Sequence, residues 1–215
     1  GTPMSRFTRN LLILPLALAL GACADDATVT EYGSLSLLLT DGAGDVASAW
    51  VTIDRIYLQA DEGEAAGQRV DLLTDEVTVD LITLLEATEG LVEDAIVETG
   101  FYEQLRVVVS AACIVVQGEA DAEEGPTSAV HATPGFERCG PADGMLQAPR
   151  LGRPGVEVLL PADGLQITGG RQVLVLDFDV RESFGVRAGR SGAWVMSPVI
   201  RGSAVEATGA VIARL

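Results

Sequence analysis

Residues 171–180 read RQVLVLDFDV, and this stretch decides the predicted fold. Successive side chains of an extended strand point to opposite faces. One face would therefore carry Leu174, Leu176, Phe178 and Val180. The other face would carry Val173, Val175, Asp177, Asp179 and Arg181. The alternation predicts a β-strand that has one face in an apolar core.

Further segments with the pattern of β-strands lie on both sides of this stretch. Segments 34–40, 91–98, 103–117, 156–160, 165–168 and 193–201 read as further strands, and PADG at 161–164 and GG at 169–170 mark turns. The similar segments 70–74 and 79–83 read as two neighbouring strands, and 81–89 allows a short helix. Many strands at short spacing predict an all-β protein, an antiparallel β-sandwich of prealbumin-like or immunoglobulin-like Greek-key type, with at most one short helix.

Segment 49–59 (AWVTIDRIYLQ) fits either a helix or a strand. Its apolar residues can line one helical face, but β-branched residues are frequent in it and favour a strand. The alternation of apolar and polar residues changes register near Arg55, as a β-bulge allows. We therefore expect a bulged strand. Gly100-Phe101-Tyr102 precedes a long strand, and its tyrosine hydroxyl is expected to bond back to the preceding connection.

Four blocks carry a family resemblance: GSLSLLLTDGAGDVASAWVTIDRIYL (33–58), VDLITLLE (79–86), ETGFYEQLRVVVSAACIVV (98–116) and VLDFDVRESFGVRAGRSGAWVMSPVIRG (175–202). Together they resemble the bacterial domain of unknown function 4382, over roughly residues 33–202. The resemblance implies a lipid-anchored or secreted β-sandwich, and it carries no catalytic residues across. Gly42-Ala43 departs from the pattern, since a small residue followed by proline is expected there.

The N-terminal region has the layout of a secretory signal. Arg6 and Arg9 precede an apolar run at 11–20, which is too short to span a bilayer. Leu20-Gly21-Ala22-Cys23 resembles the bacterial lipobox, in which the cysteine is lipidated. The sequence thus predicts a signal peptide at 1–22, an acidic tether at 23–32, a β-sandwich at 33–202 and a C-terminal strand or tail at 203–215. Lipid on Cys23 would make the membrane a partner and place the protein in the cell envelope. An Asp after the lipidated cysteine favours retention at the inner membrane of bacteria. Because Ala24 stands there instead, the outer membrane is expected.

Charge and composition exclude several functions. The chain has a net charge of -17, 31 acids and 14 basic residues, all of them Arg. No basic cluster is available for phosphates, so nucleic acid is not expected as a partner. The absence of Lys excludes Schiff-base chemistry. Protein or glycan at the cell surface is the expected kind of partner.

Two further cysteines, Cys113 and Cys139, predict a disulfide in an oxidising compartment. A zinc site is disfavoured, since zinc usually takes four ligands and the chain has one histidine, His131.

Chemical motifs are scarce. No HExxH, GxSxG or CxxC string occurs, so the chain is expected not to be an enzyme; a two-carboxylate hydrolase is the alternative, because such a pair has no fixed spacing. The GxGxxA string at 42–47 reads as a turn rather than a dinucleotide site.

No cofactor is expected, with calcium as the exception to consider. A calcium site, serving a calcium-dependent carbohydrate or adhesion module, would use Asp41, Asp45, Asp177 and Asp179. Residues 183–192 read as a binding loop with candidates Phe184, Arg187 and Arg190, and Trp194 just after the loop is a further candidate.

Overall fold

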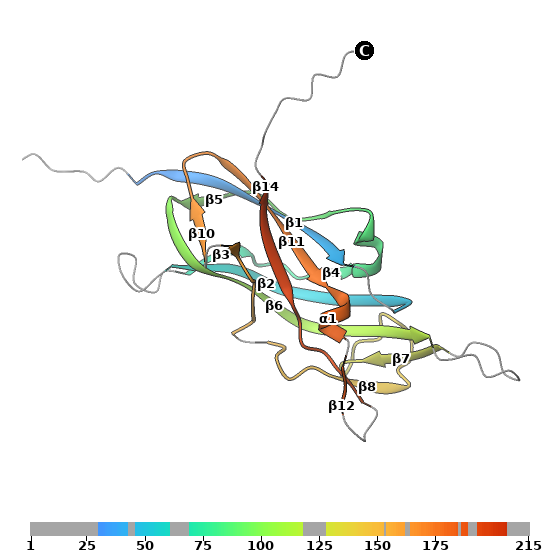
Figure 1. Ribbon diagram of the computed structural model, residues 1–215. Coiled ribbons are helices and arrows are strands. Elements are labelled where there is room, and N and C mark those ends of the chain that lie inside the picture. Colours follow the sequence, from blue (N-terminus) through green and yellow to red (C-terminus); the bar gives the residue numbers. More distant parts are fainter. Residues whose placement is uncertain are drawn as a thin grey trace, which may run out of the picture.

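The protein is a β-sandwich of two sheets (Figure 1). In this computed structural model the structure describes residues 30–42, 46–60, 69–117, 128–152, 154–161, 164–184, 186–188 and 193–205. Within these residues no helix is long and apolar enough to cross a membrane.

The smaller sheet has four strands, in the order β14 (Ile200–Val205), β11 (Arg171–Asp179), β1 (Tyr32–Gly42) and β5 (Glu89–Glu98). β1 pairs parallel with β11 and antiparallel with β5. β11 pairs antiparallel with β14. The first strand therefore lies inside the sheet, beside a strand from the last third of the chain.

The larger sheet is built around the long strand β6 (Gly100–Gln117) and β2 (Ser48–Ala60). From one side to the other its order is β12 (Val186–Ala188), β13 (Ala193–Val195), β8 (Gly144–Gln147), β7 (Ser128–Ala132), β6, β2 and β3 (Arg69–Leu73). β4 (Val77–Asp80) also pairs with β2, while β9 (Val156–Glu157) and β10 (Leu165–Ile167) also pair with β6.

Alternation of apolar residues along the strands produces the core. Leu174, Leu176 and Phe178 of β11 are buried, as the sequence predicts, and they join apolar residues of both sheets in one cluster. Segment 49–59 lies within strand β2, and the register shift between Ile53 and Arg55 confirms the expected bulge. Short helices occur at η1 (Leu81–Leu85, 3-10) and α1 (Val180–Phe184).

The all-β sandwich is confirmed, but its sheets are mixed rather than purely antiparallel. β1–β11, β7–β8 and β8–β13 are parallel pairs. Parallel neighbours need a crossover connection, which strand patterning does not reveal. One strand prediction also needs correction, since segment 193–201 contains β13 and the start of β14, which lie in different sheets. The neighbouring strands β3 and β4 both pair with β2.

Two local predictions are confirmed. The Tyr102 hydroxyl donates to the Glu98 carbonyl oxygen at 3.1 Å, across the turn before β6. Burial, followed by the negative charge of Glu98, raises the pKa of Tyr102 above its ordinary value. Cys113 and Cys139 form a disulfide with their Cα atoms 6.0 Å apart.

Candidate functional site: a cleft at the edge of the sandwich

Three of the four aspartates predicted to bind calcium lie at the ends of two paired strands. In the parallel register of β1 and β11, Asp41 lies opposite Phe178, whereas Asp177 and Asp179 lie opposite Thr40 and Gly42. Residues opposite one another share a face, so Asp41 points into the core and the other two point away from it. In this register Asp41 does not share a face with Asp177 and Asp179.

Two of these aspartates hold the start of helix α1. Asp179 Oδ1 accepts from the Glu182 amide at 2.8 Å, and its Oδ2 lies 2.8 Å from Arg201 Nη1. Asp41 Oδ1 accepts from the Val180 amide at 3.3 Å. Carboxylates are favoured at helix N-termini because the first amide groups there have no partner within the helix.

Asp177 lies beside this pair. Burial, followed by the negative charge of Asp179, raises its pKa, and Arg201 opposes the shift. Asp45 lies outside the described residues. Across the part of the chain that the structure describes, no three His, Cys, Asp or Glu side chains are grouped to hold a metal ion.

The predicted binding loop also differs from expectation. Phe184 is 1% exposed and its ring stacks on Phe178, with centroids 6.4 Å apart, so it belongs to the core. Trp194 is partly buried in β13 and packs against the core, with its ring centroid 6.0 Å from that of His131. Arg187 lies in β12, where its side chain is not described, and Arg190 lies outside the described residues, as does Cys23. The aromatic candidates are thus packing residues.

A further hollow is lined in part by another segment, residues 149–152 and 154–159, which we call the edge segment. It runs along the side of β6 that does not pair with β2, between β7 and β10, and it contains β9. The Gly152 amide donates to the Val109 carbonyl at 3.0 Å, and the Val158 amide donates to the Leu105 carbonyl at 2.8 Å. The Leu159 amide then donates to the Ile200 carbonyl at 2.9 Å. The edge segment therefore joins the larger sheet to β14 of the smaller sheet.

Side chains of the larger sheet fix the middle of the edge segment. The Tyr57 hydroxyl donates to the Pro154 carbonyl oxygen. Arg106 Nη1 donates to the Gly155 carbonyl oxygen at 3.1 Å, and Arg106 Nη2 pairs with Glu157 at 3.0 Å. Gly155 has a φ of 89°, and a Cβ there would lie 3.0 Å from the Val107 carbonyl oxygen. This close approach to β6 requires glycine.

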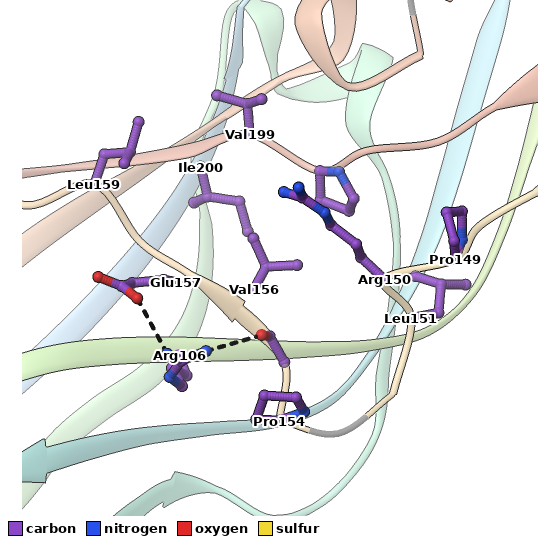
Figure 2. Close-up of a pocket in the computed structure, with 12 residues that line it drawn as sticks. Arg106, Pro149, Arg150, Leu151, Pro154, Val156, Glu157, Leu159, Val199 and Ile200 are labelled. Atoms are coloured by element: carbon purple, nitrogen blue, oxygen red, sulfur yellow. Dashed lines mark hydrogen bonds and ion pairs between the residues drawn. The ribbon is translucent and has the colours of Figure 1, made fainter.

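A cleft of about 620 Å³, here called the edge cleft, lies between the edge segment and residues 198–200. This volume lies within the range of about 300–1,000 Å³ that small-molecule sites occupy. Figure 2 shows Val156, Val199 and Ile200 on its walls, with Arg106 and Glu157 joined at one side. The Arg150 side chain extends into the cleft toward the wall formed by Val199 and Ile200 (Figure 2).

A second hollow of about 370 Å³, the Tyr57 hollow, shares Pro154 with the edge cleft. Asp54, Arg55, Tyr57, Arg69 and Val108 complete its lining. The Arg69 guanidinium lies 3.8 Å from the centroid of the Tyr57 ring and is ion-paired to Asp71 at 2.6 Å. Arg69 therefore covers a face of the tyrosine ring.

The two hollows concentrate positive charge in an acidic protein. Their linings contain Arg55, Arg69, Arg106 and Arg150 against two acids, Asp54 and Glu157. Glu157 is paired with Arg106, and Arg69 is paired with Asp71 outside the linings. Within the described residues, Arg55 and Arg150 form no ion pair. These two guanidinium groups can therefore bind an acidic group of a ligand without breaking a described ion pair.

Sequence reasoning did not find this site. The stretch 149–155 (PRLGRPG) lies in a poorly patterned region, and its mixture of Pro, Gly and Arg was the available signal. No short-range pattern indicates that it would pack against Tyr57 or reach Ile200. Those contacts depend on the pairing of distant strands.

The fold and the edge cleft define a β-sandwich with a hollow along β6, lined by apolar and Arg side chains. The chain belongs to the family described as Domain of unknown function (DUF4382), whose model matches residues 32–198. No curated protein and no solved structure matches the chain.

Proposed function

We propose that this protein is a lipid-anchored protein of the bacterial cell envelope, and that it is not an enzyme but a binding module that takes its ligand in the edge cleft. The observation that supports it is the lining of the cleft. Apolar walls formed by Leu151, Val156, Leu159 and Val199 surround a small number of charged groups, which is the usual composition of a ligand site.

The charged groups of the cleft favour binding over catalysis. A hydrolase with two carboxylates needs both of them beside the scissile bond. Among the described residues, Glu157 is the one acid lining the edge cleft and Asp54 the one lining the Tyr57 hollow. Glu157 is moreover ion-paired with Arg106 at 3.0 Å, so neither lining holds a pair of carboxylates.

The rim of the cleft offers a variant for testing this proposal. Leu159 is 57% exposed, so replacing it should not disturb the core. Met145 is 59% exposed and does not line the cleft, which makes it a matched control. The experiment is a fragment screen by ligand-observed NMR on the full chain, repeated with Leu159→Gln and Met145→Gln. The expected result is a set of fragments whose binding weakens in Leu159→Gln alone.

Binding that is equal in both variants would place the ligand elsewhere and overturn the assignment of the cleft. Turnover of glycoside or ester fragments would support the hydrolase instead. The anchor is tested separately by mass spectrometry of the membrane fraction. An acylated N-terminal Cys23 is expected, and an unmodified Cys23 that still carries residues 1–22 would contradict the anchor.

A further inference from the structure

We infer that the ligand of the edge cleft is an acidic peptide segment of a partner protein, whose carboxylates bind Arg150 and Arg55 on the two sides of Pro154. This inference rests on the proposed binding function and adds the chemical class of the ligand. Both arginines line hollows that share Pro154, so one extended ligand can contact both.

The charge of the two hollows favours an anionic ligand. Arg150 extends into the edge cleft (Figure 2), and Arg55 lines the Tyr57 hollow. A guanidinium group holds a carboxylate through two parallel hydrogen bonds, which lysine cannot do. The acids of the two linings are Asp54 and Glu157, and Glu157 is already paired with Arg106. Charges beyond about 8 Å are largely screened at physiological salt, so the nearby arginines dominate.

The walls of the cleft favour a peptide over other anions. Leu151, Val156 and Leu159 give an apolar surface that suits side chains next to a carboxylate. Sugar rings are commonly held on open aromatic faces. In the two described linings the aromatic residue is Tyr57, and Arg69 covers a face of its ring. Nucleic acid is disfavoured because its phosphates need a continuous basic surface.

The test is a selection of random dodecapeptides displayed on phage against the full chain. Asp and Glu are expected to be enriched at least about twofold over the starting library, next to apolar residues. In fluorescence polarisation with a selected peptide, Arg150→Gln and Arg55→Gln should each weaken binding about tenfold, which corresponds to about 1.4 kcal/mol, since each loses a charge-assisted hydrogen bond. Arg181→Gln is the matched control: Arg181 is exposed and lines neither hollow, so this variant should bind within about twofold of the wild type.

The outcomes separate the two proposals. Peptides that lack acidic enrichment but lose binding in Leu159→Gln would overturn the acidic ligand and keep the cleft as a binding site. Acidic peptides that bind the Arg55, Arg150 and Leu159 variants as well as the wild type would overturn both, as would failure to select any peptide. Oligogalacturonate serves as an acidic glycan probe, and tighter binding of this probe with the same arginine dependence would replace the peptide by a glycan.

Discussion

The Tyr57 hydroxyl donates a hydrogen bond to the main-chain carbonyl oxygen of Pro154, a residue 97 positions further along the chain. Tyr57 is 5% exposed although it lies on the face of β2 opposite to the core residues Ile56 and Leu58. The edge segment and Arg69 together cover it. One bond between β2 and the edge segment thus contributes to the shape of both hollows.

Removing this bond should loosen the edge segment. Tyr57→Phe keeps the ring under Arg69 but leaves the Pro154 carbonyl without its donor. We expect the free energy of unfolding, measured with urea, to be about 1 kcal/mol lower than that of the wild type. Tyr32→Phe, at a tyrosine that is 54% exposed, is the control and should unfold like the wild type. Equal midpoints for the two variants would show that the bond does not hold the segment.

Alkaline pH should destabilise the protein through Tyr102. Its folded-state pKa is raised, by burial and then by Glu98, so the unfolded chain loses the phenolic proton first. Stability is therefore complete below the ordinary pKa of about 10 and falls as pH rises through the folded-state value. Tyr102→Phe should cost about 1 kcal/mol at pH 7, because the bond to Glu98 is lost.

The same variant supplies the control for the pH effect. Between pH 9 and pH 11 the urea midpoint of Tyr102→Phe should fall less than that of the wild type. The absence of Lys keeps the number of other groups that titrate in this range small. Parallel falls in both proteins would contradict the assignment to Tyr102.

Asp177 should be a site where neutralisation stabilises the fold. Its folded-state pKa is raised by burial and by Asp179, so the native state binds the proton more tightly than the unfolded chain. Stability therefore decreases as pH rises from the ordinary value of about 4 through the folded-state pKa. Asp177→Asn should raise the free energy of unfolding at pH 7 by about 0.5 kcal/mol. The gain should vanish at pH 3, and a gain that persists there would have another cause.

The disulfide should contribute strongly to stability. Cys113 and Cys139 are 26 residues apart, and closing a loop of this size contributes about 3–4 kcal/mol on the chain-entropy model. Cys139→Ser removes the bridge and leaves the buried Cys113 in place. Its urea midpoint should match that of reduced wild type and lie well below that of the oxidised protein. A reductant should not change the midpoint of the variant.

Calcium should leave the melting temperature unchanged. Asp41 and Asp179 are engaged at the start of α1, and Asp41 faces away from Asp177 and Asp179. A ligand that binds only the folded state raises the midpoint by mass action. Thermal melts at 0 and 5 mM CaCl₂ should therefore superpose. An upward shift that Asp179→Asn abolishes would restore the calcium site.

Alternating sequence patterns predicted most of the fold because burial on one face leaves a local signature. The β11 stretch and the bulge near Arg55 both belong to this kind. The hydrogen bond of Tyr102 was predicted instead from the local Gly100-Phe101-Tyr102 motif. Parallel pairing of β1 with β11 was missed, since either direction of pairing buries the same residues.

The candidate site was harder to predict, because it depends on strand register and on contacts between distant segments. Asp41 and Asp177 look alike in sequence, yet the register of two strands sends them to opposite faces. Phe184 follows a strand and reads as part of a loop, but helix α1 turns it back onto Phe178. The edge cleft depends on contacts between distant segments, such as Leu159 with Ile200, which no local pattern encodes.

The central place of β1 in the smaller sheet also affects the order in which the chain can fold. β5 can pair with β1 once about half of the chain has been synthesised, but β11 must still arrive to occupy the other edge. Until then β1 has exposed main-chain groups that can pair with any extended strand, including that of another molecule. Contacts between residues so distant in sequence form slowly. Aggregation during refolding should therefore depend on how long β1 stays unpaired before β11 binds to it.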